Sequence, residues 1–510
     1  MSVKKNSIAN YIGQSYTILI GIVITPFYLQ YLSAESYGLV GFFALMQAWM
    51  LLLDLGMTPT LSRQIAYARG QENGFNSFKK LFKSFETIFL VLSIALAIGI
   101  FFASDWIAQS WIKAETLEIK TIAYCISLMG VIIGFRWISG LYRSGINGLE
   151  DQVWLNVANS VLISLKFIGA LILLAFVTQD ISHFFEYQLF IGLIELLIFV
   201  QHFYRKLPAT VSYLGLFCFD WLSVKNIAPY ALSIAYTAGI WTLITQTDKL
   251  ILSGILSLEE FGYFSLVALA AGSITVLSGP VSQAIMPRMT LLLAQGKKKE
   301  MLRMYSRGSQ IVTFVTFAVA LMIGLYAEQL LYAWTANYEV SIWGAEILFW
   351  FSLGNGVLAI GAFQYYLQIA FGQLRFHVIG STISVLIQVP IIYYASINYG
   401  ALGAGISWFS FRVLWFILWT PIVHRKFAPG FHLKWLFRDI LPIVGTLSMV
   451  ALVMLNLFDL SLDQSRLLIF LKLAILGGGL MIFSAWSVPF VRYHLTQFIK
   501  LKFFDIYDKS

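Results

Sequence analysis

The stretch YLSAESYG at residues 31–38 recurs as ILSLEEFG at residues 255–262, an offset of 224 residues. The two copies share a leucine, a serine, a glutamate and a glycine at matching positions. At the same offset, SVLI at 160–163 recurs at 384–387. One offset shared by separated segments indicates an internal duplication. Such repeats are typical of membrane transporters, in which the substrate lies between the two halves.

The composition is that of a chain whose main solvent is lipid. Of its 510 residues, 59% are hydrophobic and only 12% are charged, and the mean hydropathy is +0.78. A soluble protein carries about 25% charged residues. Apolar runs long enough to cross a bilayer recur along the whole chain. We therefore predict an all-α polytopic membrane protein.

Fourteen membrane spans can be drawn, with boundaries good to a few residues. They are 8–32, 38–61, 83–105, 119–141, 153–177, 183–204, 227–256, 262–289, 308–331, 343–370, 376–396, 401–423, 439–458 and 466–490. The repeat begins near the first and seventh spans, which predicts two pseudo-symmetric six-helix lobes and two further helices. The expected domains are 1–225, 226–425, and 426–510 with a cytoplasmic tail.

The loops predict the orientation. Connections on one side are short and poor in basic residues, whereas those on the other, such as AQGKKKEMLRMYSRG, are long and basic. Most of the 34 Lys and Arg residues lie on the second side or at its helix ends. By the positive-inside rule that side is cytoplasmic, and an even number of spans places both termini there. The rule also explains the net charge of +9 without nucleic acid.

Lys166 lies near the middle of the fifth span, where it cannot easily reach water. Lys166 shares a helix face with Asn159. Glu195 on the next span lies at a similar depth, and it is either the ion-pair partner of Lys166 or a separate group. Arg412 is the mid-span cation of the second half. Such ions cost at least ~2.5–3.5 kcal/mol in hydrocarbon and usually face a cavity or one another.

The seventh span contains an aspartate and a lysine side by side. Asp248 and Lys249 lie about 100° apart around a helix, so we do not expect them to pair. One face carries a polar stripe that favours a cavity lining, although a packed ion pair with another helix is the alternative. The stripe comprises Thr242, Thr245, Gln246, Lys249 and Ser253.

Three further charged residues are weaker candidates. Arg136 and Arg63 lie within two turns of the cytoplasmic end of their spans, where they can simply reach the interface. Asp54 stands beside Gly56 and Pro59, a pattern that fits either a broken helix with backbone exposed to a cavity or a kink filled by packing. We assign the cations to an anionic passenger and Asp248, Glu195 and Asp54 to coupling or gating.

Motifs of other functions are missing. The sequence has no G-x-x-x-x-G-K-[ST] loop, no G-x-S-x-G and no H-E-x-x-H. Cys125 and Cys218 form neither a disulfide framework nor a zinc spacing. We therefore expect no catalytic residues, no metal and no cofactor.

The chain resembles a known family at several points. The segments LLLDLGMTPTLSRQIA, QTDKLILSGILSLEEFGYFSL, PRMTLLLAQGKKKEM and NYGALGAGIS occur in an order similar to that of Wzx-type O-antigen flippases. These belong to the multidrug/oligosaccharidyl-lipid/polysaccharide (MOP) exporter superfamily. The resemblance covers nearly the whole chain.

This resemblance implies a flippase of the bacterial inner membrane that works by alternating access. Its passenger would be an undecaprenyl-pyrophosphate-linked oligosaccharide, with Lys249, Lys166 and Arg412 as cations for the pyrophosphate. A polysaccharide polymerase, a chain-length regulator and a coupling H⁺ or Na⁺ are possible partners.

Three alternatives remain at this point. A drug or organic-cation antiporter of the same superfamily predicts a cavity dominated by carboxylates, and a lipid II flippase shares the fourteen helices and the cations. A membrane-embedded polymerase or ligase needs a large external loop, and the longest one here is about fifteen residues.

Overall fold

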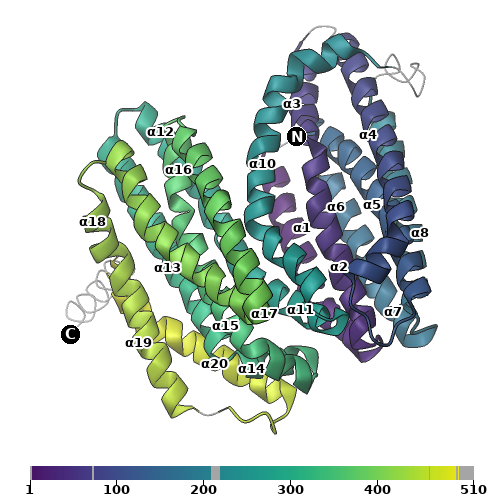
Figure 1. The fold of residues 1–510 in the computed structure, drawn as a ribbon. Coiled ribbons are helices and arrows are strands. Elements are labelled where there is room, and N and C mark those ends of the chain that lie inside the picture. The colour runs from purple at the N-terminus through teal and green to yellow at the C-terminus, as the bar shows by residue number, and fades with distance from the viewer. Residues whose placement is uncertain (1–2, 72–73, 208–218, 459, 490–491, 493–510) are drawn as a thin grey trace, which may run out of the picture. The chain divides into compact units, whose positions relative to one another are not determined.

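A computed structural model describes residues 3–71, 74–207, 219–458, 460–489 and 492 (Figure 1). The chain divides into two compact units, Met1–Gly262 (unit 1) and Tyr263–Ser510 (unit 2). Cys218 lies outside the described residues. The predicted lobe boundaries at 225/226 and 425/426 stay predictions.

Unit 1 is a bundle of long helices with an aromatic core. Phe82, Phe89, Phe199 and Phe203 are fully buried in that core. The helices are α1 (Val3–Ile24), α2 (Ala34–Met50), α3 (Met57–Arg69), α4 (Gly74–Trp106), α5 (Ile119–Gly148), α6 (Gln152–Ser164), α7 (Ala170–Phe176), α8 (Ile181–Lys206), α10 (Trp221–Ile255) and the first turn of α11 (Leu258–Val276). Short 3₁₀ turns cover Thr25–Gln30 and Leu51–Asp54, and π-helical turns cover Ile107–Trp111 and Leu165–Gly169.

Unit 2 has its own core, in which Tyr305, Phe363 and Trp435 are buried. Beyond α11 its helices are α12 (Gly279–Ala294), α13 (Lys298–Leu325), α14 (Ala327–Thr335), α15 (Tyr338–Gly361), α16 (Phe363–Ala370), α17 (Arg375–Phe427), α18 (His432–Trp435), α19 (Leu441–Leu457) and α20 (Arg466–Ser484). A π-helical turn covers Leu436–Ile440 and a 3₁₀ turn covers Ala485–Ser487.

The described residues contain 13 helical segments long and apolar enough to span a membrane. One of them, α17, has 53 residues and would be about 80 Å long if straight, against a hydrocarbon core of about 30 Å. Gly400 interrupts it with φ 59° and ψ −145°, a conformation open essentially only to glycine. Two crossings therefore meet at Gly400, and the count agrees with the fourteen predicted spans.

The second span is shorter than predicted. The span drawn over 38–61 ends at Asp54, and α3 starts afresh at Met57. Leu55 and Gly56 both have positive φ, at 48° and 71°, so the helix is broken where the Asp-Leu-Gly pattern suggested. A β-carbon on Gly56 would lie 2.2 Å from the Ala231 carbonyl oxygen, and the break is thus packed tightly against α10.

The two copies of the repeated stretch touch each other. A β-carbon on Gly38 would lie 2.0 Å from the carbonyl oxygen of Leu258, and one on Gly262 would lie 3.1 Å from that of Ala34. Because Ala34 corresponds to Leu258 and Gly38 to Gly262, the same contact is made twice with the copies exchanged. The starts of α2 and α11 therefore meet through a reciprocal pair of close contacts.

A loop from the α4–α5 connection is bound next to these contacts. The Glu35 carboxylate accepts hydrogen bonds from the backbone N–H groups of Glu115, Thr116 and Leu117, at 2.6–3.1 Å. Lys113 forms an isolated parallel bridge with Ser257, and its ammonium donates to the Ile255 carbonyl at 2.8 Å. The buried Glu35 thus satisfies backbone donors that the short loop cannot pair within itself.

Many large apolar side chains lie on the outer surface of the helices. Phe176 is 84% exposed, Phe102 78% and Ile482 75%. A soluble chain does not leave so much apolar surface in water, whereas lipid tails cover it at no cost. With the thirteen apolar segments, this defines a multi-pass membrane protein.

Candidate functional site

A cluster of charged side chains lies inside unit 1, around the π-helical turn Leu165–Gly169. This turn interrupts the fifth span between α6 and α7 and carries Lys166, which is 8% exposed. The Lys166 ammonium donates to the carboxylate of Glu195 on α8, which is 1% exposed. The structure therefore joins the two mid-membrane ions that the sequence placed at similar depth.

The same carboxylate has a second cation. Arg143 on α5 donates from Nη2 to the other oxygen of Glu195. Its guanidinium stacks over the buried Phe199 ring, 4.9 Å from the ring centroid. A carboxylate held by two cations is well compensated, and such pairing is what allows a charge to remain buried.

Arg136 adds a third cation two turns further into the membrane on α5. It donates to Gln47 on α2, and at 2.8 Å to Gln188 on α8. Gln188 in turn donates to the Lys166 carbonyl at 2.9 Å, which links Arg136 to the turn that carries the lysine. Both of these hydrogen-bond partners of Arg136 are neutral amides.

The cluster has an excess of positive charge. Lys166, Arg143 and Arg136 are three cations against the single carboxylate of Glu195, which leaves two positive charges in excess. In a low dielectric such charges interact strongly with any anion that comes close. The arrangement suits an anionic ligand, and arginine in particular suits phosphate.

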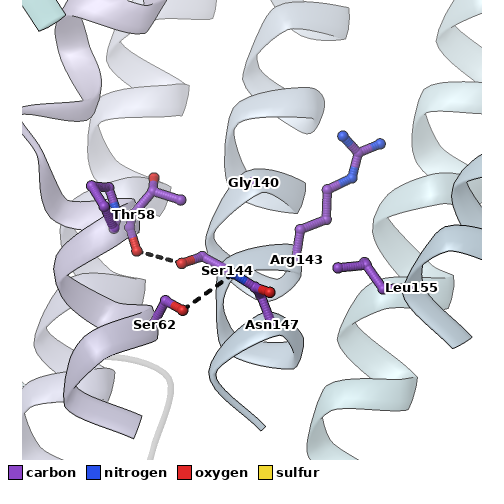
Figure 2. Close-up of a pocket in the computed structure, with 8 residues that line it drawn as sticks. Thr58, Ser62, Gly140, Arg143, Ser144, Asn147 and Leu155 are labelled. Carbon is purple, nitrogen blue, oxygen red and sulfur yellow. Dashed lines mark hydrogen bonds between the residues drawn. The ribbon is translucent and has the colours of Figure 1, made fainter. Parts of the chain in front are cut away.

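An open cavity of about 520 Å³ gives access to one member of this cluster. Its walls come from α3, α5 and α6, and Arg143 is the charged residue among them (Figure 2). Ser144 donates to the Thr58 carbonyl, and Asn147 donates to the Ser62 hydroxyl at 3.4 Å. The other lining residues are Pro59, Gly140 and Leu155. The lining surface is thus mostly apolar, with Arg143 and small polar side chains among its residues.

The other arginines assigned from the sequence also lie on aromatic rings. The exposed Arg63 stacks over Tyr230 at 4.7 Å, and Arg136 over Phe43 at 4.9 Å. In unit 2 the buried Arg412 stacks over Trp408 at 4.1 Å and donates to Gln388 at 2.9 Å. Stacking on an aromatic ring orients a guanidinium and leaves the N–H groups around its edge free to donate hydrogen bonds.

The prediction that Asp248 and Lys249 cannot pair is wrong. The Lys249 ammonium lies 3.9 Å from a carboxylate oxygen of Asp248, because the long lysine side chain bends back along the helix. It also donates to the Thr245 carbonyl at 2.7 Å. Asp248 is buried, whereas the Lys249 side chain is 27% exposed.

The remaining polar residues of the α10 stripe donate along their own helix, and Ser253 also accepts a hydrogen bond from Trp111 Nε1 at 3.0 Å. Thr242 and Thr245 donate to the carbonyls of Ala238 and Trp241 at 3.1 and 2.9 Å. Gln246 donates to the Thr245 hydroxyl at 3.4 Å. The stripe therefore lies on α10, apart from the cluster that surrounds Glu195, and its cavity role stays a prediction.

Asn159 and Asp54 have contrasting surroundings. The Asn159 Oδ1 atom is buried without a hydrogen-bond partner among the described residues. Asp54 caps α3 by accepting from the Thr58 backbone N–H at 3.3 Å and from the Thr58 hydroxyl. Asp54 is thus part of the helix break and not of the cationic cluster.

Sequence reasoning missed Arg143. The fourth span was predicted to end at residue 141, which left Arg143 in a cytoplasmic loop, but α5 continues to Gly148. The useful signal was its spacing of seven residues from Arg136, which puts both on one helix face.

Known structures share this fold. A structure of the lipid II flippase MurJ in an inward closed conformation matches with a TM-score of 0.72 at 14% identity, over 96% of this chain and 99% of that one. An inward-facing multidrug resistance MATE family transporter of the MOP superfamily matches with a TM-score of 0.65 at 15% identity, over 84% and 97%. The protein is therefore a multi-pass membrane protein with the fold of MOP superfamily transporters.

The sequence comparison is more specific. Residues 3–293 match the polysaccharide biosynthesis protein family, and the chain belongs to that family. It is also 23% identical over 428 residues to a Shigella flexneri protein named "Putative O-antigen transporter", over 81% of this chain and 96% of that protein.

Proposed function

We propose that this protein is a flippase that moves an undecaprenyl-pyrophosphate-linked oligosaccharide across the bacterial inner membrane. The passenger, an O-antigen or similar repeat unit, would travel from the cytoplasmic to the periplasmic leaflet by alternating access. Both termini would be cytoplasmic. Its relatives are named as transporters and flippases, which supports a role other than that of an enzyme.

The observation that carries this proposal is the cationic cluster of unit 1. A pyrophosphate crossing the membrane needs compensating charge, and Lys166, Arg143 and Arg136 supply three cations around one carboxylate. Arg143 is the cation of the cluster whose side chain lines the open cavity, so we assign the contact with the passenger to it, while the other two strengthen the field.

A drug or organic-cation antiporter fits this cluster less well. A cationic drug would be repelled by the excess positive charge beside the cavity. A lipid II flippase carries the same lipid-linked pyrophosphate and would use the same cations, and the MurJ fold spans nearly the whole chain. Family membership favours the polysaccharide repeat unit over the peptidoglycan precursor.

The test is complementation in a strain that lacks this gene. The wild-type gene should restore surface polysaccharide and clear the lipid-linked repeat unit from the cytoplasmic leaflet. Arg143→Gln should fail to do so at normal protein level. The matched control is Arg69→Gln, because Arg69 is an exposed arginine paired with Glu150 at 3.4 Å.

Repeat units that reach the periplasmic leaflet normally in the deletion strain would contradict the proposal. In that case the protein would act after translocation. Dependence on an H⁺ or Na⁺ gradient, and binding to a polymerase or chain-length regulator, can be measured in the same strain.

A further inference from the structure

Glu195 is the only carboxylate among the described residues that pairs with the cations of the cluster. Its two oxygens are divided between two donors, since one accepts from Arg143 and the other from Lys166. The side chain is 1% exposed, while the Arg143 side chain is 36% exposed. Glu195 thus holds, on its buried side, an arginine whose side chain also lines the cavity.

We propose that Glu195 acts as an internal substitute for a phosphate of the passenger and that an incoming diphosphate displaces it from Arg143. This inference rests on the proposed function and names the residue that controls the affinity of that site. Carboxylate and phosphate oxygens accept from the same guanidinium fork, so they compete for it. In an empty site Glu195 would then compensate part of the positive charge of Arg143 and Lys166.

Arg143 is the member of the cluster that can exchange partners. It lines the cavity, whereas Lys166 is 8% exposed and is not among the lining residues. Its guanidinium rests on the Phe199 ring, and this contact does not depend on which anion it binds. Its Nε atom is buried with no hydrogen-bond partner among the described residues.

Glu195 keeps a partner when Arg143 leaves it. The Lys166 ammonium still donates to its other oxygen, which avoids an uncompensated buried carboxylate. Arg136 is bonded to Gln47 and Gln188 and adds positive field without taking part in the exchange. The displacement therefore replaces one anion at Arg143 with another.

Removal of the competing carboxylate should raise affinity. In Glu195→Gln the neutral amide no longer competes for Arg143, and we expect a soluble isoprenyl diphosphate to bind about fivefold tighter or more, the lower end of typical coupling. Arg143→Gln should weaken binding, and in the double variant the gain should disappear.

The measurement is isothermal titration of the full chain in phosphatidylcholine nanodiscs with farnesyl diphosphate. The matched control is Glu86→Gln, since Glu86 is another buried carboxylate of unit 1 and is paired with Lys83 at 2.7 Å. This control should bind as the wild type does. Should Glu195→Gln fail to fold, Glu195→Asp, which keeps the charge but reaches less far, should show a smaller gain.

The outcomes separate the two proposals. One outcome contradicts the displacement alone: farnesyl diphosphate binds and Arg143→Gln weakens its binding, but the folded Glu195 variants bind it no tighter than wild type does. The diphosphate site would then be supported without the displacement. If Arg143→Gln leaves binding unchanged, or the wild type binds nothing, the site itself is wrong and the displacement falls with it.

Discussion

Gly38 lies so close to Leu258 that a β-carbon on the glycine would stand 2.0 Å from the leucine carbonyl oxygen. The equivalent glycine of the second copy, Gly262, approaches Ala34 less closely, at 3.1 Å. A duplicated motif therefore packs against itself chiefly through backbone atoms, which cannot move aside as a flexible side chain can.

This contact predicts a graded loss of stability. Gly38→Ala should force α2 and α11 apart and cost about 1–3 kcal/mol, as overpacking typically does. Gly262→Ala should lower stability less, because the added β-carbon would lie 3.0 Å or more from its nearest neighbours. The midpoint of thermal unfolding in detergent measures both. Gly99→Ala on α4, where nothing lies within 4 Å, is the control and should not be destabilised; equal midpoints for all three variants would contradict the prediction.

The loop held by Glu35 should open when that carboxylate is removed. Glu35→Ala leaves the N–H groups of residues 115–117 without their acceptor, and the loss of such hydrogen bonds to a charged group costs about 1.5–3 kcal/mol each at most. Hydrogen exchange at these amides should become faster. The neighbouring exposed Glu118, changed to Gln, should leave their exchange unaltered. Unchanged exchange in Glu35→Ala would mean that the loop is held by other contacts.

The pair of Lys166 and Glu195 should be energetically coupled. Lys166→Met leaves Glu195 with Arg143 alone, and removing one partner of a buried pair costs about 3–5 kcal/mol. Since Arg143 remains, we expect the lower end. The Lys166→Met/Glu195→Met double variant should recover much of that loss, as measured by unfolding midpoints in a double-mutant cycle. Strictly additive losses would show that the two ions do not stabilise one another.

Asp151 predicts a dependence of stability on pH. Burial alone would raise the pKa of this carboxyl, but hydrogen bonds from Lys206 and His202, both at 3.0 Å, outweigh it and lower the pKa below its ordinary value. The folded protein therefore favours the ionised form. Its stabilisation is complete above the unfolded pKa of about 3.9 and disappears as the pH falls through the lower folded value.

The measurement is the unfolding midpoint between pH 7 and pH 3. Wild type should be more stable than Asp151→Asn at pH 7, and the difference should shrink toward the acid end. Lys206→Met removes one of the donors and should reduce the same difference. A gap between wild type and Asp151→Asn that stays constant with pH would contradict the assignment.

Gly400 should be intolerant of any side chain. Its φ of 59° with ψ of −145° lies in a region that costs other residues about 1–3 kcal/mol. Gly400→Ala should therefore lower the unfolding midpoint. Gly445→Ala in α19, with open space around it, should be neutral or slightly stabilising and serves as the control. A Gly400→Ala protein as stable as wild type would mean that the break does not need glycine.

The fold could be predicted because it depends on the hydrophobicity of long segments of the chain. Apolar run length defined the spans, and Gly56 marked the break after the second one. The site was predicted less well, because burial depends on where helices end and which faces meet. Arg143 was assigned to a loop since the cytoplasmic end of α5 is polar, and the bend of Lys249 toward Asp248 cannot be deduced from helical angles.

The contact between α2 and α11 has a consequence for the separated halves of the chain. Each copy contains both sides of the contact, a glycine and the carbonyl that receives it, and is thus self-complementary in the manner of an isologous dimer. A fragment of about one repeat length would carry that interface without its covalent partner. Two such fragments in the same membrane orientation would meet as a homodimer, in which Gly38 of each copy faces Ala34 of the other.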